Sequence, residues 1–116
     1  MSTDLLALRD SLRSFVQARD WAQFHSPMSL ACSLVIEASE LLEAFQWLTD
    51  EQSKQLTAEQ KKAVVMEVGD VLIYLVEFCD VMGIDPLQAA RDKLAVNERK
   101  YPAERARGNS RKYTEL

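Results

Sequence analysis

Hydrophobic residues recur three or four positions apart along most of the chain, which is the spacing of amphipathic helices. Between Leu5 and Val16 they mark a first helix, which Ser2 or Thr3 caps and which ends near Arg19. Only three glycines and three prolines interrupt the chain, and no alternating apolar and polar run of useful length indicates a strand. The pattern therefore predicts an all-α fold.

Three more helices follow from the same periodicity. A Ser-Pro pair opens a second helix over about 26–47, and a polar connection over 49–56 follows it. A Thr-x-x-Gln capping box opens a third helix over 57–83, which a glycine ends. An Asp-Pro pair opens a fourth over 85–100, and Tyr-Pro stops it. The last stretch, 103–116, is polar and basic, so its own pattern predicts little structure.

Composition is typical of one globular domain. The chain has 116 residues, of which 47% are hydrophobic. No apolar stretch approaches the roughly 20 residues that span a bilayer, and the start MSTDLLALRD lacks the features of a signal peptide, so we expect a cytoplasmic protein. Cys32 and Cys79 lie in apolar helical patterns without CxxC spacing, so we expect reduced core residues.

The net charge of -4 conceals an asymmetry along the chain. Residues 91–116 hold eight Lys or Arg against four acids, a net +4, whereas the remainder holds six against fourteen, a net -8. A nucleic-acid polymer is bound by an extended basic face, which this balance does not favour. A small anion held together with metal ions fits it better.

Two predicted helices carry the same pair of acids. Glu37 and Glu40 lie about 60° and about 120° from the apolar stripe of their helix, and Glu67 and Asp70 hold the same two angles on theirs. If the two helices pack antiparallel through those stripes, the four carboxylates converge. Glu43 lies on the far side of its helix from the stripe, and we expect it on the surface.

Four converging carboxylates repel one another unless hard cations lie between them, and such oxygen ligands suit Mg²⁺ or Mn²⁺. The alternative is that the acids form a solvated flank of two amphipathic helices. A ferritin-like di-iron site would use Glu-x-x-His, but the only histidine, His25, lies outside both acid pairs. The matched spacing favours the magnesium interpretation.

The acid pairs resemble the ExxE and ExxD signature of the all-α nucleoside triphosphate pyrophosphohydrolases, the MazG-like group. Further segments extend the resemblance over nearly the whole chain and are similar to the dCTP pyrophosphatases of that superfamily. These segments are RDWAQFH, ELLEAFQW, DVLIYLVEF, NERKYPAERAR and SRKYTEL.

The resemblance implies a four-to-five-helix MazG-like bundle completed by oligomerisation into a dimer or tetramer. The bundle would span residues 1–102, and the basic tail, 103–116, would order on substrate or on a neighbouring chain. The implied reaction is Mg²⁺-dependent cleavage of a deoxynucleoside triphosphate, dCTP or a 5-modified dCTP, to the monophosphate and pyrophosphate.

The resemblance also implies roles for individual residues. Glu37, Glu40, Glu67 and Asp70 would bind Mg²⁺, with Mn²⁺ a possible substitute, and would serve the catalytic step. The chain departs from similar animal enzymes at Leu12, where they have a polar substrate-contacting residue. The implied substrate contacts are Trp21, Phe24, His25, Trp47, Tyr74, Lys93, Asn97, Arg111 and Lys112.

Each of these substrate contacts has a plainer interpretation. The aromatic residues form a stacking slot for a pyrimidine or else belong to the core or to a subunit interface. Tyr74 lies about 80° from the stripe of its helix, on the carboxylate side, which favours a place in the site. His25 alone is typical of a loop cap, and a basic tail is commonly a solvated end. At the level of function, the alternatives are a broad-specificity house-cleaning triphosphatase and a non-catalytic helical scaffold.

Overall fold

The computed structural model describes residues 2–116, and every regular element in this range is helical. The all-α prediction is therefore confirmed. Four longer helices alternate with short helical turns. In chain order the elements are α1 (Thr3–Ala18), η1 (Ala22–Phe24), α2 (Pro27–Glu43), α3 (Asp50–Ser53), α4 (Ala58–Met82), α5 (Pro86–Lys100), α6 (Ala103–Ala106) and η2 (Tyr113–Glu115).

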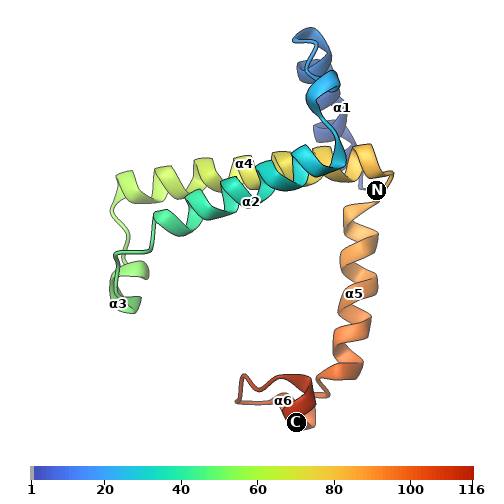
Figure 1. Ribbon diagram of the computed structural model, residues 1–116. Helices are drawn as coiled ribbons and strands as arrows, with labels where there is room; N and C mark the ends of the chain where they lie inside the picture. Colours follow the sequence, from blue (N-terminus) through green and yellow to red (C-terminus); the bar gives the residue numbers. More distant parts are fainter. Residues whose placement is uncertain (1) are drawn as a thin grey trace.

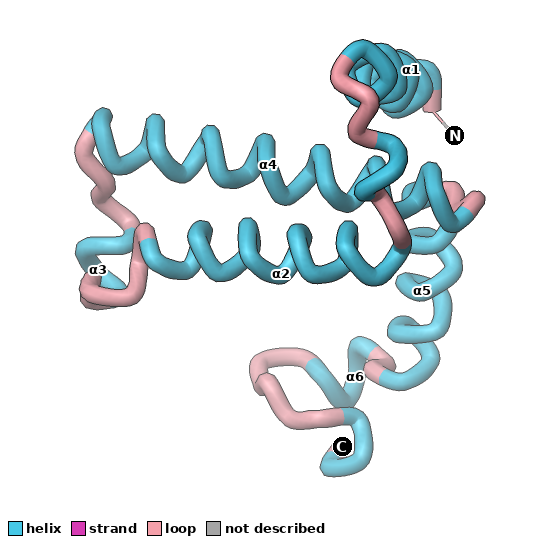
Figure 2. Tube along the Cα trace, turned by 45° about the horizontal axis from the view of Figure 1, so that its top comes forward, coloured by secondary structure: helices cyan, strands magenta, loops and turns pink. Residues whose placement is uncertain are grey.

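An antiparallel pair of helices, α2 and α4, forms the centre of the chain (Figures 1 and 2). The first helix, α1, lies beside the C-terminal half of α4, whereas α5 leaves the pair and carries α6 and the C-terminus away from it. The small core lies where α1, α2 and α4 meet. Its buried apolar residues are Val16, Leu30, Val76 and Cys79.

Local signals set most of the helix boundaries. The hydroxyl of Ser26 accepts a hydrogen bond from the backbone N–H of Ser29 at 3.1 Å and caps α2. Thr57 and Gln60 form the reciprocal capping box that starts α4. Gly83 ends α4 with a φ of 69°, in the left-handed region that favours glycine. These predicted starts and stops are confirmed.

Three predictions differ from the structure. Helix α2 ends at Glu43, and residues 44–47 form turns rather than a helical continuation. The polar connection contains a single-turn helix, α3, because Thr49 and Gln52 form a second capping box there. Cys32 is a free thiol but is exposed, so its assignment to the core was wrong. It lies on a part of α2 that no other described element covers.

A bidentate ion pair attaches α1 to α4. The guanidinium of Arg13 donates to the two carboxylate oxygens of Asp80 at 2.8 and 2.6 Å. Hydrogen bonding to Arg13 lowers the pKa of Asp80, which keeps the carboxylate ionised. Because the two groups are planar and matched, this contact fixes the orientation of α1 as well as its distance from α4.

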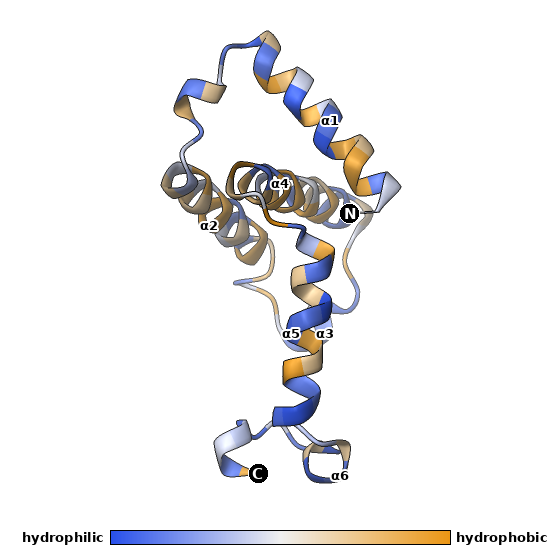
Figure 3. Cartoon of the chain, turned by 90° about the vertical axis from the view of Figure 1, so that its right-hand side faces the viewer, coloured by the Kyte–Doolittle hydropathy of each residue, from blue (hydrophilic) through white to orange (hydrophobic). Residues whose placement is uncertain are grey.

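Much apolar surface of the single chain is uncovered. Many residues of α2 and α4 are hydrophobic (Figure 3), and several of their side chains are more than half exposed. Contiguous apolar surface of this kind is typical of a subunit interface. None of the helices among residues 2–116 is long and apolar enough to cross a membrane. The exposed residues on the central pair include Met28, Val35, Ile36, Leu42, Val65, Met66 and Val68.

Candidate metal centre and adjoining cavity

Acids from α2 and α4 meet between the two helices. Carboxylate oxygens of Glu37, Glu67 and Asp70 all lie within 4.8 Å of one another, and all three residues are half-buried. Glu40, one turn after Glu37 on α2, is more exposed and is coupled electrostatically to Glu37 and Glu67. The antiparallel packing thus brings three of the four predicted acids together, whereas Glu40 is exposed beside them.

The crowding of negative charge changes the acidity of the cluster. A hydrogen-bonding contact with Glu40, then burial, then the charges of Glu40 and Asp70 raise the pKa of Glu37 to about 7. Burial, followed by the charge of Glu40, raises the pKa of Glu67. Without a cation, the cluster therefore holds a proton more tightly than isolated carboxyl groups do.

Two oxygens of the cluster lack a partner. Oε2 of Glu37 and Oε2 of Glu67 are buried and form no hydrogen bond with any group in residues 2–116. A buried carboxylate oxygen is costly unless a donor or a cation offsets its desolvation. The donor set consists of carboxylate oxygens only, which suits a hard divalent cation. The residues present therefore fit a metal ion.

A cavity of about 390 Å³ opens beside the acid cluster, between α1 and α4. Asp70 and Tyr74 line it from α4, and Trp21 and His25 line it from the segment between α1 and α2. Burial, and then the charges of Glu77, Glu37 and Asp70, raise the pKa of Tyr74. The remaining lining residues are Ser11, Leu12, Phe15, Ile73 and Glu77.

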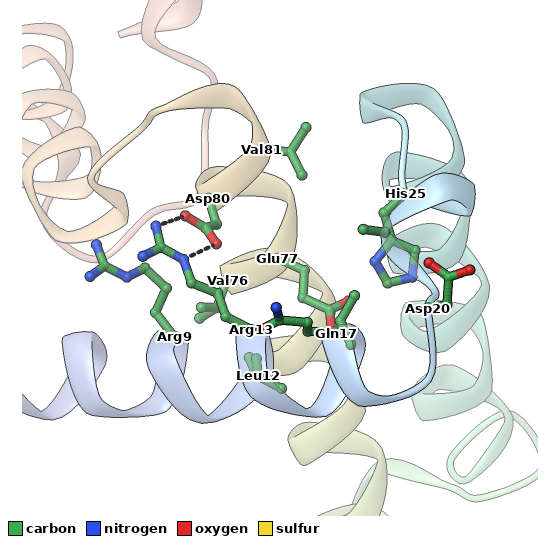
Figure 4. Close-up of a pocket in the computed structure, with 12 residues that line it drawn as sticks. Arg9, Leu12, Arg13, Gln17, Asp20, His25, Val76, Glu77, Asp80 and Val81 are labelled. Atoms are coloured by element: carbon green, nitrogen blue, oxygen red, sulfur yellow. Dashed lines mark hydrogen bonds and ion pairs between the residues drawn. The ribbon is translucent and has the colours of Figure 1, made fainter.

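A second cavity, of about 370 Å³, adjoins the first and lies between α1, α4 and the loop before α2 (Figure 4). The two cavities share Leu12, His25 and Glu77. Figure 4 shows the Arg13–Asp80 ion pair at one side of this second cavity and His25 with Asp20 at the other. The two cavities therefore adjoin beside α1, and together they are called the groove below.

Glu77 is a polar residue of this groove that the sequence analysis did not select. It follows Asp70 by seven residues on α4, or two turns, which places the two acids about 20° apart around the helix. Its Oε2 is buried and has no hydrogen-bond partner in residues 2–116. The seven-residue spacing was the available signal, but nothing in the sequence indicated that α1 covers that face.

The other predicted substrate contacts lie outside this groove in the single chain. Phe24 is 64% exposed, and Trp47 is 87% exposed in the turn after α2, at the end of the helix pair away from α1 (Figure 1). Lys93 and Asn97 lie on α5. Arg111 and Lys112 lie in the tail, beyond α6. One chain does not gather these residues, and their roles stay predictions.

The model of the MazG-like family matches residues 32–116. The chain belongs to the MazG-like family. Its matched region includes both acid pairs and starts after α1. The MazG-like chain is 42% identical to a pyrophosphatase from Archaeoglobus fulgidus, whose crystal structure it matches with a TM-score of 0.83 over 88% of this chain and 95% of that one.

Curated relatives are similar to this MazG-like chain over 104 residues, or 88% of its length. The dCTP pyrophosphatase 1 of Homo sapiens is 46% identical and that of Bos taurus is 40% identical. The aligned region covers 61% and 62% of those proteins. The chain thus spans about three fifths of the curated relatives that it matches.

The acidity of Glu37 predicts how pH acts on the metal-free protein. Because its pKa is higher in the folded state, at about 7 against an ordinary 4.5, the stabilisation from its bound proton is complete below about 4.5 and is lost as pH rises through about 7. A divalent cation binds the deprotonated form, so the rise in melting temperature on adding Mn²⁺ should grow between about pH 6 and about pH 8. Thermal unfolding followed by circular dichroism, with and without Mn²⁺, measures both trends.

The control for this prediction is Glu37→Gln, which keeps the side-chain shape and removes the titration. In that variant the melting temperature without metal should change less over the same pH range. A gain from Mn²⁺ that is the same at pH 6 and pH 8 in the unmodified chain would contradict the prediction.

Proposed function

We propose that this chain is a divalent-metal-dependent nucleoside triphosphate pyrophosphohydrolase that converts dCTP, or a 5-modified dCTP, and water to the monophosphate and pyrophosphate. The observation that carries the proposal is the convergence of Glu37, Glu67 and Asp70 beside a cavity lined by Trp21 and Tyr74. Membership of the MazG-like family and similarity to proteins named dCTP pyrophosphatase 1 support the same activity and substrate. The cytoplasmic location expected from the sequence stays a prediction.

The reaction requires water to attack the α-phosphorus. The bond between the α-phosphorus and the oxygen that bridges the α- and β-phosphates then breaks, and pyrophosphate leaves. Mg²⁺, or Mn²⁺ in its place, would be held by Glu37, Glu40, Glu67 and Asp70 and, when bound, would neutralise phosphate charge and acidify water. One carboxylate of the cluster would orient the attacking water and accept its proton.

The adjoining cavity would hold the base. Its volume of about 390 Å³ lies within the range of small-molecule pockets. The indole of Trp21 and the ring of Tyr74 provide flat faces for stacking, a contact worth ~1 to 3 kcal/mol per base. His25, at the same cavity, can hydrogen-bond the edge of the base. Asp70 belongs to the acid cluster and also lines this cavity, so the triphosphate would extend from the cavity toward the cluster.

A homo-oligomer, a dimer or tetramer, would complete this site. The uncovered apolar side chains of α2 and α4 supply the interface, and a second copy would bring Trp47 or the tail residues to a groove that they do not line within one chain. Symmetric packing of identical faces is the default for small homo-oligomers. We propose that Phe24, Trp47, Lys93, Asn97, Arg111 and Lys112 contact substrate in this assembly.

The acid cluster is tested by Asp70→Ala and Glu67→Ala. Each change removes a ligand that no other described side chain replaces, so Mg²⁺-dependent release of pyrophosphate from dCTP should fall about a hundredfold or more. The helical circular-dichroism signal should stay. Glu43→Ala, on the exposed side of α2, is the matched control and should retain turnover. Turnover that survives in either Asp70→Ala or Glu67→Ala would refute the ligand assignment.

The substrate is tested by a steady-state screen of canonical and 5-modified deoxynucleoside triphosphates. We expect the highest kcat/KM for dCTP or a 5-modified dCTP, with the monophosphate and pyrophosphate as the products. A kcat/KM that is flat across bases would identify a broad house-cleaning pyrophosphatase instead. Release of orthophosphate and a diphosphate would refute the reaction, and no turnover together with no metal binding would favour the non-catalytic scaffold.

The oligomer is tested by sedimentation equilibrium at micromolar concentration. We expect two or four times the 13.2 kDa mass of one chain. Val68 lies on the uncovered face of α4, and Val68→Glu places a charge there, so this variant should shift the protein toward monomer. Glu59→Gln, in the exposed first turn of α4, serves as the control. A monomeric mass for the unmodified chain would contradict the proposed assembly.

A further inference from the structure

We infer that Glu77 selects the base, by accepting a hydrogen bond from the exocyclic amino group of a cytosine-type pyrimidine in the groove between α1 and α4. The inference rests on the proposed function, because it assumes that a nucleoside triphosphate is bound beside the acid cluster. It assigns base selection to a side chain outside the two acid pairs.

The position of Glu77 supports this role. It lines both cavities of the groove, together with Leu12 and His25, and one of those cavities is also lined by Asp70 and Tyr74. A base that stacks on Tyr74 or Trp21 would therefore lie in a cavity that Glu77 also lines. Asp70 and Glu77 are two turns apart on one face of α4. One nucleotide could therefore place its phosphates near Asp70 and the edge of its base near Glu77.

The unsatisfied oxygen of Glu77 indicates what the ligand must supply. Its Oε2 is buried without a hydrogen-bond partner in residues 2–116. Both arginines that line the groove are engaged in ion pairs with aspartates: Arg13 with Asp80 at 2.6 Å and Arg9 with Asp10 at 3.0 Å. A buried acceptor of this kind is stabilised by a ligand that donates a hydrogen bond.

The other carboxylates that line the groove are engaged: Asp80 by Arg13 and Asp20 by Gln23, while Asp70 belongs to the acid cluster. Leu12, opposite on α1, offers only apolar contact. Burial raises the pKa of Glu77, and the neighbouring His25 partly offsets that rise, so the carboxyl group is incompletely solvated. An arriving amino group would offset that loss of solvation.

The chemistry of the pyrimidines gives the selectivity. Cytosine and its 5-modified forms carry an amino group at C4, which donates a hydrogen bond to a carboxylate. Uracil and thymine carry a carbonyl oxygen at C4, which would face the carboxylate as a second acceptor and leave both groups unpaired. A site built to pair with a donor discriminates strongly against an analogue that lacks it.

The test is the ratio of kcat/KM for dCTP to that for dUTP, measured at pH 8 with Mg²⁺ in the unmodified chain and in Glu77→Gln and Glu77→Ala. The unmodified chain should favour dCTP, and each variant should reduce the ratio about tenfold or more, mainly through a loss on dCTP. Glu59→Gln, in the exposed first turn of α4, is the matched control and should leave the ratio unchanged.

A substrate test covers variants that fail to fold. A dCTP analogue whose 4-amino group is replaced by hydrogen should have a kcat/KM about tenfold or more below that of dCTP in the unmodified chain. A merely structural role for Glu77 would lower kcat/KM equally for dCTP and dUTP, and that result would overturn the inference. So would an analogue that is cleaved as well as dCTP.

The outcomes also separate this inference from the proposed function. Preference for dCTP in the unmodified chain, with an unchanged ratio in Glu77→Gln, would overturn the inference alone. No release of pyrophosphate from any deoxynucleoside triphosphate would overturn the proposed function and the inference together.

Discussion

Mutual repulsion among carboxylates is the constraint on which the centre of this molecule depends. Packing α2 against α4 forces Glu37, Glu67 and Asp70 within 4.8 Å of one another, in partial burial. The apolar stripes of the two helices must offset that cost, which is why the acids lie at the border of the stripes and not in their middle. A proton on Glu37 relieves part of the repulsion, and a divalent cation would relieve more of it.

The groove beside the acids depends on a different contact. Helix α1 lies outside the region that matches the family model, and the Arg13–Asp80 ion pair holds it on α4. Without α1, Tyr74 and Glu77 would face solvent rather than a cavity. The acid cluster and the groove thus have separate structural origins: the cluster comes from the α2–α4 pair, and the groove from the segment that precedes α2. In the proposed reaction, this separation would allow base selection to vary while the metal ligands stay the same.

The sequence predicted the features that follow from helix geometry. Helix periodicity is local, so the spacing of Glu37 and Asp70 relative to their stripes was sufficient to predict that the acids meet. Features that depend on packing between distant segments were harder to predict. Glu77 has the right spacing from Asp70, but its burial results from α1, some sixty residues earlier in the chain. Cys32 was misplaced for the converse reason, since its apolar surroundings face no partner within the chain.

The distribution of charge bears on how a triphosphate could be held. The groove contains Arg9 and Arg13, but both are engaged by aspartates, while the predicted phosphate contacts Lys93 and Arg111 lie on α5 and in the tail, outside either cavity. An acidic cluster that receives a polyanion needs positive charge from elsewhere. Metal ions supply part of it, and side chains of a second copy supply the rest in the assembly we propose. The uncovered faces of α2 and α4 are where that copy would pack, so the proposed oligomer would contribute to the chemistry of the site as well as to the stability of the fold.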